Sequence, residues 1–258
     1  MDFIANASLL ELGLACLLVV AGVSLVSTGL GSLAELAFSS HTQIWAVPLR
    51  DGQLRHERLS YLRFIVLAAA SATLFLGLGW VEFGATGIGA VALTFAIQWT
   101  AFEIYYYGLH RALHSQALYR FHAHHHESHV TTAWTGQSLS VVEALGWIAG
   151  VLIPPALASQ IAPISFEGFM IYFVANTFVN VAGHANVELN PLNQRALTWL
   201  VHPWLYHSLH HARFKNNYSF ASTFMDRFFG TEWKDWPELH GRVFGGEAMT
   251  RLNERGEA

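Results

Sequence analysis

The stretch FHAHHHESH, residues 121–129, places five histidines in nine positions, and YHSLHHARF, residues 206–214, repeats part of that pattern. Both contain the motif H-x-x-H-H, formed by His122, His125 and His126 and again by His207, His210 and His211. Residues three and four apart lie on the same side of a helix. The motif therefore predicts that the imidazoles of each stretch stack along one side of a helix.

Three further histidines fit the same helical spacing. His110 and His114 are four residues apart in LHRALH, and His184 ends an apolar segment in NVAGHANVEL. Isolated histidines, such as His41 and His56, are more often hydrogen-bonded structural residues, and a histidine-rich tract can bind zinc loosely. Two copies of H-x-x-H-H, each beside an apolar segment, favour a structured metal site instead.

The number of histidines bears on the metal. One zinc ion needs about four ligands, so nine histidines are too many for a single zinc site. Two ions with four or five nitrogens each would use all nine and leave a position for a small ligand. Imidazole suits iron, copper and zinc, and iron with open positions is the usual activator of oxygen. The sequence thus predicts two iron ions.

The composition indicates a membrane protein. Hydrophobic residues make up 53% of the 258 residues and charged residues 12%, and the mean hydropathy is +0.33, too apolar for an ordinary soluble domain. The net charge of −4 argues against a nucleic-acid partner, and the single cysteine excludes a disulfide framework. The start MDFIANASLLEL lacks a basic region, so we expect the apolar stretch after it to remain as an anchor.

Five apolar segments approach the ~20 residues needed to cross a bilayer. They are Leu9–Leu30, Ile65–Phe83, Gly87–Tyr107, Val141–Ile161 and Ile164–Gly183. The turns EFGATG and APIS join the second to the third and the fourth to the fifth as helical hairpins. Pro154–Pro155 predicts a kink or an interruption in the fourth segment. We expect one membrane domain over residues 1–258.

The basic residues set the expected orientation. All 14 lysines and arginines fall after the first, third or fifth segment, or at the edge of the second, and the two short turns carry none. The positive-inside rule places that side in the cytoplasm, and every histidine lies there too. We therefore expect an all-α integral membrane protein with about four to five membrane helices and a cytosolic helical cap carrying the histidines. Abundant alanine and an excess of arginine over lysine suggest a bacterial inner membrane.

Carboxylates near the histidines are candidates for orienting the rings and offsetting the charge of two ferrous ions. Glu127, Glu188 and Asp226 are placed for this role, with Glu103 two helical turns deeper than His110. An ionisable group at that depth is a functional hypothesis. The alternative for Glu103 is a protonated acid held against another helix.

Four motifs resemble the sterol desaturase/fatty acid hydroxylase superfamily of integral membrane di-iron oxygenases. They are EIYYYGLHRALHS, LYRFHAHHHES, GHANVEL and HSLHHARFKNNYSFASTFMDRFFGT, and the resemblance covers roughly residues 95–235. It implies a cytosolic histidine cap over two metals and oxygen-dependent hydroxylation or desaturation of a lipid. It also implies electrons from a separate carrier, such as a ferredoxin or a cytochrome with its reductase, because residues 1–95 show no fused haem domain.

Carried over motif by motif, the resemblance assigns the metal ligands as His110, His114, His122, His125, His126, His184, His207, His210 and His211. Glu103, Glu127 and Asp226 are the candidate catalytic carboxylates, and Asn217 matches a polar position of the closing motif. His124 falls on a variable position. Some members have another histidine where this chain has Glu188, so a tenth ligand would be Glu188, Asn186, His202 or a water.

The reaction is open at this stage. LYRFHAHHHES and GHAN look closer to hydroxylases than to sterol ring desaturases, which favours hydroxylation with desaturation as the alternative. A metal transporter or storage protein is a rival, but transporters place ligands near the bilayer midplane. A non-catalytic relative that keeps its metals for stability is a further alternative. The substrate that the resemblance implies is a lipid: a sterol, a fatty acyl chain or a related molecule.

Overall fold

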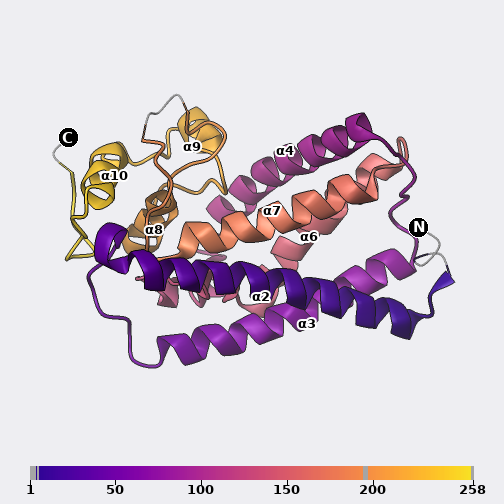
Figure 1. Ribbon diagram of the computed structural model, residues 1–258, viewed down its shortest axis with the longest axis horizontal. Helices are drawn as coiled ribbons and strands as arrows, with labels where there is room; N and C mark the ends of the chain where they lie inside the picture. The colour runs from indigo at the N-terminus through magenta and orange to yellow at the C-terminus, as the bar shows by residue number, and fades with distance from the viewer. Residues whose placement is uncertain (1–3, 5, 194–196, 257–258) are drawn as a thin grey trace.

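The computed structural model describes residues 4, 6–193 and 197–256 (Figure 1). These residues form helices joined by loops, with isolated bridges and no strands in the described part of the chain. The helices are α2 (Leu9–Thr42), α3 (Gln53–Gly77), α4 (Ile88–Leu113), α5 (Tyr119–His122), η1 (His125–Glu127), η2 (Thr135–Gln137), α6 (Val141–Ser159), α7 (Phe166–His184), α8 (Trp204–Arg213), α9 (Phe224–Phe229) and α10 (Trp236–Phe244). The all-α prediction is confirmed.

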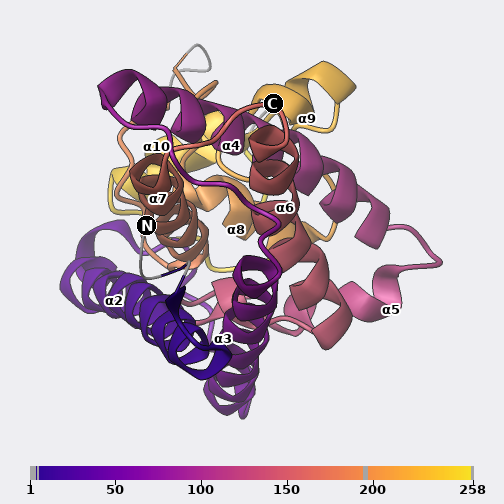
Figure 2. The same cartoon turned by 90° about the vertical axis from the view of Figure 1, so that its right-hand side faces the viewer.

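Five long helices make a bundle along the long axis of the molecule. Figure 1 shows α2, α3, α4, α6 and α7 running along this axis, with α8, α9 and α10 gathered at the end that holds the C-terminus. Helix α7 packs against both α2 and α4, while α6 packs against α3 and α4. Viewed along the bundle in Figure 2, α7 lies between α2 and α4.

Four helices, α2, α3, α4 and α6, are long and apolar enough to cross a membrane. Large side chains on their outer faces stay uncovered: Leu18 is 73% exposed, Leu93 62% and Leu157 65%. Apolar residues facing outward from a bundle are suited to lipid rather than to water. The sequence thus predicted a membrane protein correctly.

Helix α7, the expected fifth span, is not among these four candidates. It carries the buried side chains Asn176, Thr177 and Asn180. These buried polar residues lower the hydropathy of α7, while apolar side chains on its outer face stay uncovered: Ile171 is 53% exposed and Val174 46%. The interruption expected at Pro154–Pro155 is not found, since α6 continues through both prolines as one helix; the kink there stays a prediction.

Serine caps begin both helices of the second hairpin. The Ser140 hydroxyl accepts a hydrogen bond from the Glu143 amide at the start of α6, and the Ser165 hydroxyl accepts one from the Gly168 amide at the start of α7. Such caps satisfy amides that have no partner within the helix. They fix where each helix starts and so which residues face the bundle interior.

The two predicted hairpin turns lie side by side at the end of the bundle away from the C-terminus. Phe83 and Ile164 form a parallel bridge, in which the Ile164 amide donates to Glu82 O at 3.0 Å and the Gly84 amide donates to Ile164 O at 3.1 Å. The N-terminus lies at the same end (Figure 1). This arrangement agrees with the hairpins expected from the sequence.

The opposite end is closed by a cap centred on α8. The apolar side chains Leu205, Tyr206 and Leu209 are fully buried and pack with Trp236 and Leu239 of α10. The histidines of α8 occupy its other face, which is also buried. The cap therefore holds one side of α8 in an apolar core and presents the other to the end of the bundle.

We predict that the two turns share one side of the membrane and the C-terminal region occupies the other. In a Cys16→Ala background, Thr86→Cys and Ala162→Cys should react with a membrane-impermeant thiol reagent from the same side. Thr250→Cys should react only from the opposite side. Labelling of Thr86→Cys and Thr250→Cys from a common side would contradict this topology.

Candidate metal centre

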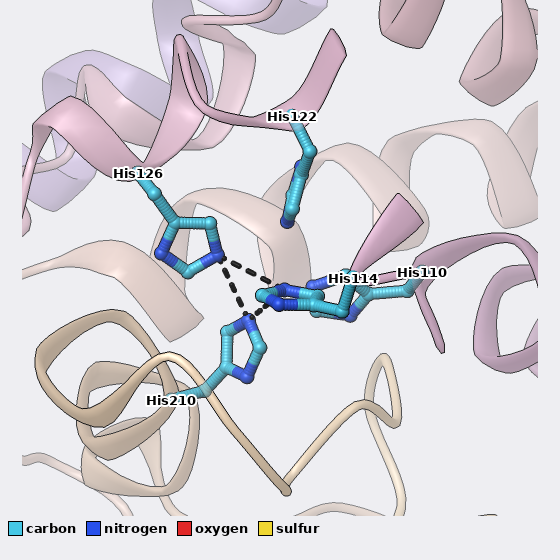
Figure 3. Close-up of side chains that lie close together, drawn as sticks. All are labelled: His110, His114, His122, His126 and His210. Carbon is cyan, nitrogen blue, oxygen red and sulfur yellow. Dashed lines mark hydrogen bonds between the residues drawn. The ribbon is translucent and has the colours of Figure 1, made fainter. Parts of the chain in front are cut away.

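The nine histidines singled out in the sequence come together in two groups at the junction of bundle and cap. Within each group, one ring nitrogen of every member lies within 4.8 Å of those of the others. The five-histidine group, shown in Figure 3, consists of His110, His114, His122, His126 and His210. The four-histidine group consists of His125, His184, His207 and His211.

Each H-x-x-H-H motif divides its histidines between the two groups. The expectation that the histidines of a motif lie along one side of a helix holds for α8, where the rings of His207 and His210 stack with their centroids 5.3 Å apart, and is wrong for the first motif. His122 ends α5, and His125 and His126 belong to the separate turn η1. On α8, His207 and His211 are four residues apart and enter the four-histidine group, whereas His210 enters the other. Adjacent helical residues differ by about 100° in direction, so His210 and His211 point to different groups.

Most of the rings are held by their outer nitrogen. In five of them Nδ1 donates to a backbone carbonyl: His110 to Tyr218 O (2.8 Å), His210 to Asn216 O (2.7 Å), His125 to Ser138 O (3.2 Å), His184 to Asn180 O (2.6 Å) and His211 to Ser128 O (3.0 Å). A hydrogen bond of this kind fixes the tautomer and leaves a lone pair on Nε2. The rings are thus set to present Nε2 to the interior of each group.

The inward nitrogens lack ordinary partners. The Nε2 atoms of His114, His126 and His210 lie 3.0–3.2 Å from one another (dashed lines in Figure 3). Within the described part of the chain, four more buried Nε2 atoms have no hydrogen-bond partner: those of His110, His122, His207 and His211. Converging, unsatisfied lone pairs in a buried site are satisfied by a cation. The residues present therefore fit a metal ion in each group.

Burial keeps these imidazoles neutral. It lowers the pKa of His114 from 6.5 to about 4. Burial, followed by the neighbouring imidazoles, lowers the pKa well below the ordinary value at His122, His125, His126, His207, His210 and His211. Only a neutral imidazole can ligate a metal, so at neutral pH the rings are in the form that binds.

Glu143 is a site residue that the sequence did not single out. Its Oε1 lies 2.7 Å from Nδ1 of His122, and the side chains of the pair are 1% and 2% exposed. It orients His122 as the backbone carbonyls orient the other rings, and it adds an acidic group to the five-histidine group. The sequence feature that could have identified Glu143 is its position as an acidic residue in the first turn of an otherwise apolar segment.

Asp226 and Glu103 hold the segment after α8 and do not contact the histidines directly in the described structure. Asp226 accepts hydrogen bonds from the Tyr218 and Ser219 amides at 2.9 and 2.8 Å. Glu103 accepts from the Ala221 amide at 2.9 Å and from Ser222. Since Tyr218 O accepts from His110, Asp226 acts on that ring through the backbone.

The asparagines of the closing motif shape the same segment. Asn216 and Asn217 have φ values of 61° and 52°, in the left-handed region that asparagine tolerates better than most residues. Phe214 caps the end of α8 in the same conformation. The resulting reversal of the chain brings Asn216 O back to His210.

Glu127 lies at the surface although it directly follows His126. Its Oε2 forms an ion pair with Arg50, and with His56 and His124 it makes a third, half-buried cluster. His124 bonds to Ser60 at 2.7 Å. None of the three carboxylates proposed as catalytic belongs to either histidine group; Asp226 and Glu103 hold the segment after α8, whereas Glu127 belongs to the separate cluster with His56 and His124.

The proposed tenth ligands have other partners, and none belongs to either group. Glu188 accepts from the Leu205 and Asn190 amides, both at 2.8 Å, and burial raises its pKa to about 7. Asn186 pairs with the backbone of Trp45. His202 points both ring nitrogens at backbone carbonyls, each at 2.8 Å.

An apolar cavity of about 300 Å³ extends through the bundle between α2, α3, α6 and α7. Its wall includes Leu12 and Phe83 near the hairpin turns and polar side chains such as Gln137 and Asn180. Asn180 also lines a small hollow beside His184 and His207. Asn180 is thus a wall residue common to the cavity and to the hollow beside the four-histidine group.

Comparison with known proteins agrees with this geometry. The profile of the fatty acid hydroxylase family matches residues 95–231, so the chain belongs to this family, within the superfamily indicated by the histidine motifs. It is similar to the very-long-chain aldehyde decarbonylase GL1-6 of Oryza sativa, with 34% identity over 152 residues, 56% of this chain and 24% of that protein. The corresponding protein CER1 of Arabidopsis thaliana is 38% identical over 137 residues, 50% of this chain and 21% of that protein.

The chain thus spans about a quarter of the length of these curated relatives. No solved structure is significantly similar to it. The relatives named here are plant proteins, and they give no support to the bacterial source expected from composition.

We predict that Glu143→Gln weakens metal binding in the five-histidine group. The amide cannot serve as a charged acceptor for His122, and loss of such an outer partner lowers metal affinity about 10- to 100-fold. Titration of metal-free protein with Co²⁺, followed by visible absorption, should show one weakened site. Glu127→Gln is the matched control and should bind as the wild type does; equal weakening in both variants would contradict the role of Glu143.

Proposed function

We propose that the protein is a membrane-bound oxidoreductase that uses two iron ions and dioxygen to hydroxylate a C–H bond of a long-chain lipid. The observation that carries this proposal is the pair of histidine groups beside the inner end of an apolar cavity. Iron held by imidazoles with open positions supplies the reduction and activation of dioxygen. An apolar cavity bounded by membrane helices is suited to a hydrocarbon chain.

In this proposal, the protein positions the substrate and the metal ligands. The apolar walls of the cavity bind the chain and exclude water. Asn180, shared by the cavity and the hollow beside His184 and His207, lies where the reacting carbon must approach. Backbone carbonyls and Glu143 keep the histidine rings in one tautomer, so the ligand geometry is set before substrate binds.

A second reaction, removal of the carbon of a terminal aldehyde, is suggested by the relatives, which are named as aldehyde decarbonylases. Desaturation is a third possible reaction, since hydroxylation and desaturation both begin with removal of a hydrogen atom from the substrate. The three differ in the fate of the substrate carbon, which depends on its placement relative to the metals. Membership of the fatty acid hydroxylase family supports oxidative chemistry on a lipid, and within that chemistry we propose hydroxylation.

The position of the histidines at one end of the bundle also indicates on which side of the membrane an electron donor would bind. The histidines lie at the end of the bundle that the positive-inside rule assigns to the cytoplasm, where a separate carrier such as a ferredoxin or a cytochrome can deliver electrons. A transporter would place its ligands near the bilayer midplane. The location at one end of the bundle therefore supports catalysis over metal transport.

We predict that the product carries oxygen from dioxygen. Lipids from a host expressing the protein should gain one oxygen atom relative to a host expressing the His125→Ala/His210→Ala variant. Under ¹⁸O₂ the added atom should be labelled, as read by mass spectrometry. A product shorter by one carbon would favour the aldehyde reaction, and an unlabelled product with a new double bond would favour desaturation.

We also predict that the cavity limits substrate length. Ala72 of α3 lines the cavity, and Ala72→Phe should reduce turnover of long substrates more than of short ones because its ring occupies the space of the chain. Metal content should stay at the wild-type level. Leu74→Phe, on the exposed side of the same helix, is the control, and an equal effect in both variants would contradict this binding site.

A further inference from the structure

The loop at residues 128–138 carries the groups that orient most of the four-histidine group. Ser128 O accepts from His211 at 3.0 Å and Ser138 O accepts from His125 at 3.2 Å. Gly136 O accepts from the Asn180 side chain at 2.7 Å, and Asn180 O accepts from His184 at 2.6 Å. Two of the four rings in this group thus bond directly to this loop, and a third, His184, bonds to the backbone of the residue whose side chain the loop holds.

One buried carboxylate, Glu57 of α3, holds this loop. Its side chain is 0% exposed and accepts from the hydroxyls of Ser128 (2.7 Å), Thr132 (2.7 Å) and Thr135 (2.8 Å). It also accepts from the Gln53 amide at 2.8 Å, and the same amide reaches Val130 O at 2.7 Å. A carboxylate only accepts, so it can satisfy four donors at once, which an amide in its place cannot do.

A second carboxylate, Glu35 of α2, holds the same region from the other side. Its Oε1 accepts from the Ala133 amide in the loop and from the Asn186 amide just beyond His184, both at 3.0 Å. Glu35 and Glu57 both precede residues 95–231, the part that matches the family. Helices α2 and α3 therefore contact the loop beside the four-histidine group through two acidic side chains, Glu35 and Glu57.

The contacts of Glu57 and Glu35 lead to the four-histidine group and not to the five-histidine group. In the five-histidine group, the outer partners are Tyr218 O for His110, Asn216 O for His210 and Glu143 for His122. None of these partners belongs to the loop at 128–138. A disturbance at Glu57 should consequently reach the four-histidine group first.

We propose that Glu57, assisted by Glu35, is a positioning residue that sets the metal affinity of the four-histidine group selectively. It fixes the carbonyls that orient His125 and His211, and through Gly136 and Asn180 it fixes His184. The proposal rests on the two-metal centre proposed above, but not on which reaction that centre performs.

The test is metal binding to full-length protein in detergent or nanodiscs. Wild type should take up two Co²⁺ ions per chain with high affinity. Glu57→Gln, which keeps the shape of the side chain, should take up one ion normally and the second with affinity reduced about tenfold or more, as for loss of an outer partner. Unchanged binding of both ions would overturn the proposal.

Combining Glu57→Gln with a histidine substitution in one group or the other identifies the site that Glu57 controls. His207→Ala damages the four-histidine group, and adding Glu57→Gln there should cause little further loss of Co²⁺. His122→Ala damages the five-histidine group, and adding Glu57→Gln there should weaken the remaining site about tenfold or more. Residues acting on one site are non-additive and independent ones are additive, so equal losses in both backgrounds would assign Glu57 a general scaffold role and overturn the proposal.

Two controls separate this outcome from misfolding and from failure of the metal centre itself. Glu143→Gln should give the reciprocal pattern, with the larger further loss in the His207→Ala background. If Glu57→Gln does not fold, Thr135→Val removes one of the four donors and is subject to the same criteria. Wild-type protein that binds fewer than two ions would contradict the two-metal centre, whatever the variants show.

Discussion

Nine imidazoles can share one small buried volume only if each turns an unprotonated nitrogen inward. For six of the nine, the protein meets this condition by engaging the outer nitrogen, five with backbone carbonyls and one with Glu143. A carbonyl can only accept, so it dictates the tautomer of the ring beside it. The conformations of the segments around Ser128, Ser138 and Asn216 are therefore as much part of the centre as the histidines are.

The centre lies where two kinds of packing meet. On one side, a cluster that includes Phe102, Tyr106, Trp147 and Phe220 fills the bundle. On the other, α8 rests on the apolar core of the cap. Charges interact strongly in such surroundings because little water screens them. In that setting the acidic groups near the histidines are few: Asp226 and Glu103 each accept from several donors, while Glu143 engages His122 through Oε1 and its Oε2 has no hydrogen-bond partner among the described residues.

Much of this arrangement could be read from the sequence because it depends on local spacing. Hydropathy identified the apolar helices, and the histidine motifs identified all nine members of the two groups. The division of the first motif between the two groups could not be predicted from the sequence, because it depends on the end of α5 at His122 and the start of a separate turn, η1, at His125. Proximity in sequence favoured Glu127, whereas Glu143 reaches His122 from another helix. Glu57 lies in the charged run RHERLSYLR, which resembles a solvated helix face and gives no sign of burial.

The division of the motifs has a consequence for how the protein is made. Both groups need side chains from α8: His210 completes one, and His207 and His211 complete the other. During synthesis from the N-terminus, neither group has its full set of ligands until α8 has left the ribosome. By then the apolar helices α2 to α7 have been synthesised, and domains generally fold from the N-terminus as they emerge. A metal ion that requires the full set of ligands of either group could therefore bind only after α8 has been made, and it would join the end of the chain to the helices made first.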